Sequence, residues 1–308
     1  MQNNLQNRGN ITNISFMVCA MTGFAIEDAI IKQLAIKLPI SQVLVSVGLT
    51  GSIIFYCLSI LQKDSVLQRR FIDLRFFLRM LCELISSVLF VITMVYVSLT
   101  VSSALLQLTP ILMTLGSFLL FKERILPKQW VLVLVGLFGA LLVIQPGMEI
   151  FNPVSLFAVV GAFFLASRDL LTRSMANDFP PLAIAFWGFI SLALGGIFAI
   201  PFFGPFNTFS SVDFLLIGAS SFFGPMAYLA LVFATRGGDI GVVAPFRYSR
   251  LPIAILIGVL IFDENPDSVT IGGCILIVIS GLLILGLSSG QLTKPKKGKN
   301  PNVNANMF

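Results

Sequence analysis

Two carboxylates lie side by side in the middle of an apolar run, as Glu27 and Asp28 in the stretch FAIEDAIIK. An arginine and an aspartate, Arg168 and Asp169, interrupt a second apolar run in the stretch LASRDLLTR. Charged groups are costly in apolar surroundings, and where they persist they pair with one another, bind a polar solute or relay a proton. Binding or proton transfer is therefore the chemistry that we expect of these four residues.

Two arginines in a third apolar run share one helical face, because Arg247 and Arg250 are three residues apart in APFRYSRLP. A guanidinium group presents a planar set of donors that suits a carboxylate, a phosphate or the edge of an electron-rich ring. With the phenol of Tyr248 between them, the two arginines predict a substrate clamp. An equally good interpretation is that they only neutralise buried carboxylates, Asp169 and Glu27.

A few further polar side chains lie within apolar runs. Arg79 and Glu83 are four residues apart, so we expect a local ion pair in which Arg79 extends toward the membrane surface. Glu83, one turn deeper, is a candidate cavity residue. Gln107, Tyr228 and Trp187 could stack on a ring or hydrogen-bond to it, although a membrane-interface position explains Trp187 equally well.

Prolines interrupt several of the apolar runs. A proline inside a helix removes a backbone donor and bends the helix. We therefore predict hinges at four of them: Pro110, Pro225, Pro245 and Pro252.

The elements that hold these residues must lie in a lipid bilayer. Of the 308 residues, 56% are hydrophobic and only 11% are charged, and the mean hydropathy is +0.95. Soluble domains carry about 25% charged residues. The chain has no histidine, its four cysteines are scattered, and it lacks the H-E-x-x-H and G-x-S-x-G motifs. We therefore expect no enzymatic activity, no cofactor and no metal site.

Ten apolar runs are long enough to cross a bilayer, which takes about 20 residues. They are 14–38, 42–61, 76–97, 101–121, 129–145, 154–175, 182–203, 212–235, 241–262 and 269–288. We therefore predict an all-α polytopic membrane protein with ten transmembrane helices joined by short loops.

Lysine and arginine concentrate in the loops on one side of these spans, which the positive-inside rule assigns to the cytoplasm. That side holds Arg8, the loops at 63–75 and 122–128, and the tail KPKKGK at 294–299, whereas the other side holds only Lys32 and Lys37. Both termini are thus expected in the cytoplasm. The net charge of +6 arises in these loops and tails, so we expect contact with anionic lipid and not with nucleic acid.

A shift of 141 residues superimposes the first half of the chain on the second, pairing FAIEDAIIK with LASRDLLTR and Glu123 with Glu264. Five spans per copy is an odd number, so the second copy enters the membrane the opposite way up. We predict an N-terminal tail at 1–13, two five-helix repeats at 14–145 and 154–288, and a basic tail at 289–308.

Inverted repeats are typical of secondary transporters, whose substrate sites lie near the membrane midplane between the repeats. A two-fold axis in the membrane plane would bring Glu27 and Asp28 toward Arg168 and Asp169. The repeated charge would then mark the cavity wall on both halves. The alternative is a structural ion pair between the first and sixth spans that holds the halves together without contacting substrate.

Each repeat ends its fourth span in a short acidic F-x-E turn, at Phe121–Glu123 and at Phe262–Glu264. Ten spans in a 5+5 inverted-topology repeat with such turns resemble the drug/metabolite transporter superfamily, EamA type. The stretch APFRYSRLP is similar to the ninth helix of members assigned to uptake of riboflavin or S-adenosylmethionine. The resemblance implies a helical bundle with a central cavity, an arrangement that both importers and exporters use.

We expect a secondary transporter that moves a small organic metabolite across a bacterial inner membrane by alternating access, with riboflavin uptake as the leading expectation. The alternatives are uptake of S-adenosylmethionine, efflux of an amino acid or another metabolite, and, in another class, a channel or a non-transporting scaffold. Without an ATP-binding motif, a gradient would supply the energy, and Glu27, Asp28 or Asp169 could carry a coupled proton. The sequence leaves a monomer and a homodimer equally open.

Overall fold

The computed structural model describes residues 2–62, 66, 73–121, 126–149, 151–175, 179–236 and 243–292. Within these ranges every regular element is helical. The helices are α1 (Gln2–Ala35), α2 (Ile40–Leu61), α3 (Leu74–Tyr96), α4 (Leu99–Leu106), α5 (Thr109–Phe121), α6 (Pro127–Ile144), α7 (Ser155–Ser174), α8 (Pro181–Phe203), α9 (Ser211–Arg236), the 3-10 helix η2 (Ala244–Ser249), α11 (Arg250–Phe262) and α12 (Ser268–Leu292).

Ten stretches of the described chain are long and apolar enough to cross a membrane, which confirms the predicted number of spans. The fourth span consists of α4 and α5, and the ninth consists of η2 without its first residue and of α11. Large apolar side chains cover the outside of the bundle, among them Leu61, Phe202 and Leu215, each more than 70% exposed. Such a surface suits lipid, while the helices satisfy their own backbone hydrogen bonds.

Capping residues mark where the third and fourth spans begin. Helix α3 begins after Asp73, whose carboxylate accepts a hydrogen bond from the backbone N–H of Arg75 at 2.8 Å. Helix α4 begins after Ser98, whose hydroxyl oxygen accepts one from Val101 at 3.0 Å. Serine and aspartate are favoured N-caps because they satisfy N–H groups that have no partner within the helix. The chain therefore reverses direction between α3 and α4 within two residues.

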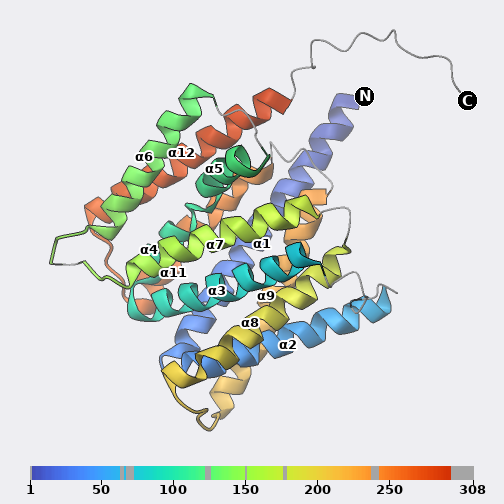
Figure 1. Ribbon diagram of the computed structural model, residues 1–308, viewed down its shortest axis with the longest axis vertical. Coiled ribbons are helices and arrows are strands. Elements are labelled where there is room, and N and C mark those ends of the chain that lie inside the picture. Colours follow the sequence, from blue (N-terminus) through green and yellow to red (C-terminus); the bar gives the residue numbers. More distant parts are fainter. Residues whose placement is uncertain are drawn as a thin grey trace, which may run out of the picture.

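The helices pair as a two-fold axis requires (Figure 1). Helix α2 packs on α8, α6 packs on α12 and α4 packs on α11, so the second, fifth and fourth spans each meet their own repeat mates. Helix α1 packs on α9 while α3 packs on α7, which is the reciprocal exchange of first and third spans. This pairing confirms the predicted fold class of two inverted five-helix repeats.

Both repeats break their fourth span at matching positions. Residues 107 and 108 separate α4 from α5, and η2 gives way to α11 at Arg250, which the 141-residue shift places opposite Thr109. Pro110 and Pro252 lie in the first turns of α5 and α11, and Pro245 lies in η2. Pro225 lies inside α9, which continues through it. That these four prolines act as hinges remains a prediction.

Helices α6 and α12 approach closely through glycine. A Cβ at Gly139 would lie 2.9 Å from the carbonyl oxygen of Gly273, and a Cβ at Gly273 would lie 2.6 Å from that of Gly139. These two helices thus meet backbone to backbone, as small residues allow in membrane bundles.

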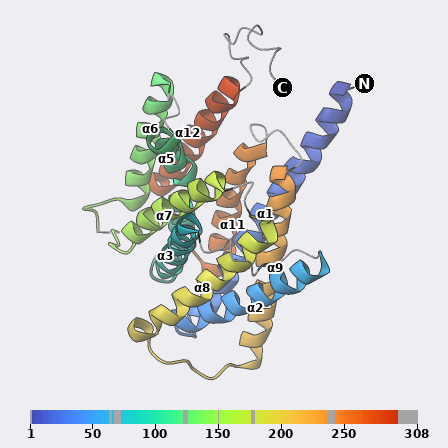
Figure 2. The same ribbon diagram turned by 45° about the vertical axis from the view of Figure 1, so that its right-hand side comes forward.

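Helix α1 begins and α12 ends at the same side of the bundle, here named the terminal side (Figure 2). The side where α3 turns into α4 and α11 into α12 is the opposite side. Several of the basic residues used to predict orientation lie outside the described residues or have side chains that are not described: Arg8, Lys63, Arg69, Arg70, Lys122, Arg124, Arg236 and the tail from residue 293. Glu123 also lies outside the described residues.

Candidate functional site

A cavity of about 250 Å³ lies between the two repeats, lined by residues of α1, α3, α7, α8, α9, η2 and α11 and by the break after α4. Nine charged or phenolic side chains that the sequence singled out line it: Glu27, Asp28, Arg79, Glu83, Arg168, Asp169, Tyr228, Arg247 and Arg250. Gln107 and Pro110, at the break between α4 and α5, also contribute to the wall.

A second cavity of about 230 Å³ shares part of this wall, including Arg168, Asp169 and Tyr228. It continues toward the terminal side, between Met17 of α1 and Val232 of α9. Ligand pockets for small organic molecules measure roughly 300–1,000 Å³. A metabolite of vitamin size would therefore occupy both cavities together.

Three helices contribute to an ion-pair network in the cavity wall. Glu83 of α3 accepts hydrogen bonds from Arg79 at 3.1 Å and from Arg168 of α7 at 2.7 Å. Arg168 also donates to its neighbour Asp169 at 2.6 Å. Arg247 of η2 lies 3.8 Å from the other oxygen of Asp169. The network thus joins side chains of both repeats.

A separate ion pair links the first and ninth spans. The guanidinium of Arg250 donates to the carboxylate of Asp28, with its Nε at 3.1 Å. Two rings flank this guanidinium, since its central carbon lies 5.5 Å from the ring centre of Phe24 and 5.8 Å from that of Phe90. Cation–π contact of this kind stabilises a guanidinium where water is scarce.

Glu27 differs from the other cavity carboxylates, because no hydrogen bond or ion pair joins it to another described residue. Its side chain lies against Gly224 of α9, where a Cβ would overlap the carboxylate. Only 8% of the residue is exposed, and it lines the cavity. A buried carboxylate in this state is available to a positively charged group or to a proton.

The predicted pairing of the charges needs correction. Glu27 and Asp28 do share a cavity with Arg168 and Asp169, but in the described part of the chain no ion pair joins the first and sixth spans. Asp28 takes its partner from the ninth span, and Arg168 takes Glu83 from the third. Of the two arginines expected to neutralise carboxylates, Arg247 does lie beside Asp169, whereas Arg250 pairs with Asp28 and not with Glu27.

Tyr248 and Arg79 lie differently from expectation. Tyr248 is outside the cavity lining, and its buried hydroxyl packs against Gly281 on α12. Arg79 is 3% exposed and does not extend to the membrane surface; its Nε donates to Thr172 at 3.3 Å. Trp187 lines neither described cavity, and its indole donates to the carbonyl of Val66 at 2.9 Å.

Aromatic side chains complete the cavity wall and were not singled out from the sequence. Phe24 of α1, Phe90 of α3 and Phe189 of α8 line it. Phe24 stands three residues before Glu27, so the two share a helical face, and that spacing was the available signal. The chain has 29 phenylalanines, however, and nothing in the sequence distinguishes those that line the cavity from the others.

Comparison with known sequences identifies the family to which this chain belongs. The EamA-like transporter family matches residues 11–145 and 152–286, two segments offset by the same 141 residues. A riboflavin transporter of Vibrio cholerae is 32% identical over 178 residues, which is 58% of this chain and 59% of that protein. An S-adenosylmethionine uptake transporter of Rickettsia bellii is 28% identical over 173 residues, 56% of this chain and 59% of that protein. The chain thus spans less than two thirds of the length of these two relatives.

Two further similarities extend over nearly the whole chain. A pseudopaline exporter of Pseudomonas aeruginosa is 26% identical over 295 residues, 93% of this chain and 98% of that protein. A solved crystal structure superposes with a TM-score of 0.64 at 16% identity, covering 94% of this chain and 100% of the other. At that identity the structural match supports the fold alone.

Proposed function

We propose that this chain, which belongs to the EamA-like transporter family, is a secondary transporter that takes up riboflavin by alternating access. As a member of that family it is a multi-pass protein of the inner membrane and not an enzyme. The observation that carries the proposal is the cavity between two inverted halves, with charged side chains from both repeats in its wall. Inverted repeats let each half adopt the conformation of the other, which exposes one central site to the two membrane faces in turn.

The lining of the cavity supports riboflavin as the substrate. Phe24, Phe90 and Tyr228 offer faces on which a flat ring system can stack. The guanidinium groups of Arg247 and Arg250 can donate to ring carbonyls. Four arginines and four carboxylates line the cavity, so its formal charge is zero, which suits an uncharged vitamin. The similarity to a riboflavin transporter agrees with this choice.

A second candidate substrate is S-adenosylmethionine, and Glu27 is the observation that favours it. The cationic sulfonium of this metabolite would meet the carboxylate that has no ion-pair partner among the described residues. Its own carboxylate would meet the network in which three arginines share Glu83 and Asp169.

We propose that both termini lie in the cytoplasm, so that the cavities continue toward the cytoplasmic face. A proton gradient is the proposed energy source, with Glu27 as the carrier. Asp28 and Asp169 are weaker candidates because each already faces an arginine. Uptake driven by an imposed proton gradient in vesicles, and lost in Glu27→Gln while substrate exchange persists, would support this role.

The test of the substrate is uptake of labelled riboflavin, and separately of labelled S-adenosylmethionine, by cells that express the chain and need the compound supplied. The control is the double variant Asp28→Asn with Arg250→Gln, which removes the ion pair without leaving one charge buried alone. We expect saturable riboflavin uptake that falls at least tenfold in the control at equal membrane abundance. Uptake of S-adenosylmethionine alone would replace the riboflavin proposal by its alternative, and uptake of neither would refute both.

A further inference from the structure

A buried ion pair lies at the opposite side of the bundle, away from the ion-pair network in the cavity wall. The ammonium of Lys32 on α1 lies 2.9 Å from the carboxylate of Glu264, two residues beyond the end of α11. Both side chains are about nine-tenths buried, at 10% and 9% exposure. Lys32 also donates to the carbonyl of Val97 at 3.2 Å and lies 4.9 Å from the ring centre of Phe262.

The same carboxylate holds the first turn of α4. Glu264 accepts hydrogen bonds from the backbone N–H groups of Leu99 and, at 3.0 Å, Thr100. These are the first two residues of α4, whose N–H groups have no partner within the helix and lie at the positive end of its dipole. One side chain of the second repeat therefore joins two elements of the first repeat, α1 and α4.

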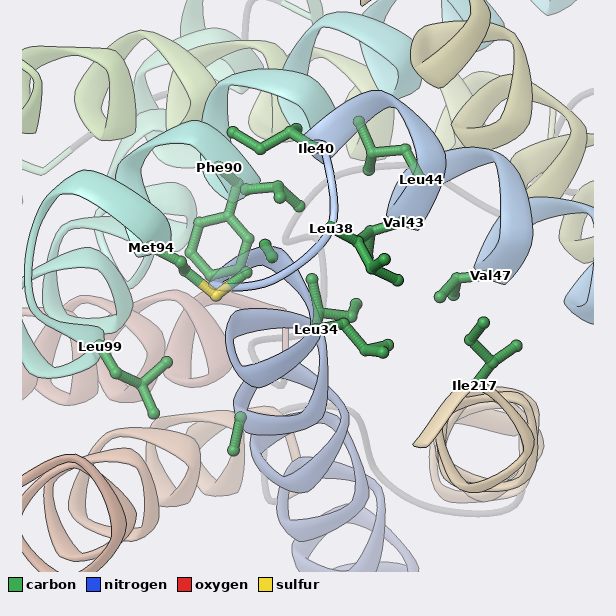
Figure 3. Close-up of a cluster of buried hydrophobic side chains, with 14 of the residues drawn as sticks. Leu34, Leu38, Ile40, Val43, Leu44, Val47, Phe90, Met94, Leu99 and Ile217 are labelled. Carbon is green, nitrogen blue, oxygen red and sulfur yellow. The ribbon is translucent and has the colours of Figure 1, made fainter. Parts of the chain in front are cut away.

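Packing around Glu264 leaves little room for it to shift. A Cβ added at Gly258 of α11 would lie 2.5 Å from the Glu264 carboxylate and 3.0 Å from the Thr100 hydroxyl. At this side of the bundle, apolar side chains of α1, α3 and α4 pack together, with Leu34, Met94 and Leu99 at most 1% exposed (Figure 3). Met94 also lines the central cavity, so this packed layer separates the cavity from the opposite side.

We propose that Lys32, Glu264 and the first turn of α4 form a gate that closes the central cavity on the opposite side and separates whenever the cavity opens there. The proposal rests on the proposed function, because alternating access requires such an opening. Helix α11 contacts both α1 and α4, and Glu264 is bonded to both. A passage between these helices therefore requires Glu264 to release Lys32 and the two N–H groups together.

The experiment measures access to the cavity and needs no substrate. In the full chain, with Cys19, Cys57, Cys82 and Cys274 replaced by serine or alanine, Met94→Cys places one thiol in the cavity wall. A membrane-impermeant maleimide is added from one side in whole cells and from the other in inverted vesicles, and a C-terminal tag identifies the terminal side. We expect Glu264→Gln and Lys32→Gln each to raise the labelling rate from the opposite side at least fivefold.

The matched control is Asp73→Asn, which removes a half-exposed ion pair with Arg75 and should leave the rate unchanged. Unchanged labelling in gate variants that reach the membrane would overturn the proposal. If Glu264→Gln fails to accumulate, Glu264→Asp keeps the charge with a shorter reach, and its labelling must then rise or the proposal fails. A labelling response without transport of either candidate substrate would keep the gate and remove the substrate proposal.

Discussion

The cavity network and the gate use the same residue types in different ways. In the network, Glu83 faces two arginines and Asp169 faces two, with side chains 3–32% exposed. In the gate, one lysine faces one carboxylate whose other bonds go to backbone N–H groups, and both side chains are about nine-tenths buried. A carboxylate with several cations nearby can exchange partners, whereas one held by a single lysine and a helix terminus is either bound or released.

This difference would give the two regions separate roles in the proposed transport cycle. The network can reorganise around a bound solute without leaving a charge alone, because each carboxylate keeps at least one arginine. The gate has no substitute partner among the described residues, so it favours two discrete arrangements. The cavity network and the gate therefore differ more in the number of partners available to each carboxylate than in the kind of charge.

The largest effect is expected from Arg168→Ala, which removes an arginine from the cavity network. Arg168 bonds Glu83 and Asp169, and removing one member of a buried ion-pair group costs about 3–5 kcal/mol. We expect a marked fall in the thermal unfolding midpoint in detergent. Arg75→Ala, which affects the half-exposed pair with Asp73, serves as the control and should change stability by no more than about 1 kcal/mol.

A smaller effect is expected from Gly258→Ala, which tests the gate side without changing any charge. The new methyl group would crowd Glu264 and Thr100, and overpacking costs about 1–3 kcal/mol. In the Met94→Cys background, labelling of the introduced thiol from the opposite side should therefore increase. Gly218→Ala is the matched control, because a Cβ there meets nothing within 4 Å; an equal increase in both variants would argue against a specific gate.

Glu27→Gln should sharpen the distinction between structure and transport. No partner among the described residues is lost, so the free energy of unfolding should change by less than about 1 kcal/mol. Transport should nevertheless fall at least tenfold if this carboxylate carries a proton or meets a cationic group. A large loss of stability in this variant would instead place Glu27 among the structural charges.

The smallest effect concerns the pH dependence of the gate. Burial raises the pKa of Glu264, but hydrogen bonds from Lys32, Thr100 and Leu99 and the charge of Lys32 outweigh it and hold that pKa below its usual value. A lowered folded-state pKa means that the carboxylate stabilises the fold above its unfolded-state pKa, and that this stabilisation is lost as pH falls through the folded value. The difference in unfolding midpoint between the wild type and Glu264→Gln should thus persist from pH 7 to pH 5 and shrink only below about pH 4.5. A difference that shrinks between pH 7 and pH 6 would contradict this assignment.

Hydropathy and the 141-residue shift were enough to predict the ten spans and their inverted arrangement. Lipid exposure requires long apolar runs, and the repeat is visible as similar residues at a constant offset. The same reasoning predicted that Glu27 and Asp28 lie near Arg168 and Asp169, and these four residues do line one cavity. It did not predict which charges pair, because partner choice depends on the rotation of each helix about its axis, and one residue changes that direction by about 100°.

The gate was missed for a related reason. Lys32 entered the prediction only as a loop charge on the side opposite the termini, and Glu264 only as the end of an acidic turn. Their contact spans 232 positions in the sequence. Only the packing of α11 against α1 and α4 brings them together, and periodicity within either helix carries no record of it.

The backbone contact between Gly139 and Gly273 has a mechanical consequence. Side chains between two helices can change rotamer and let the helices slide, but no such layer separates α6 from α12 at this point. Any shift of one past the other would press carbonyl oxygens against Cα atoms. The two helices therefore form a rigid pair, against which the other helices would have to move in the proposed alternating access.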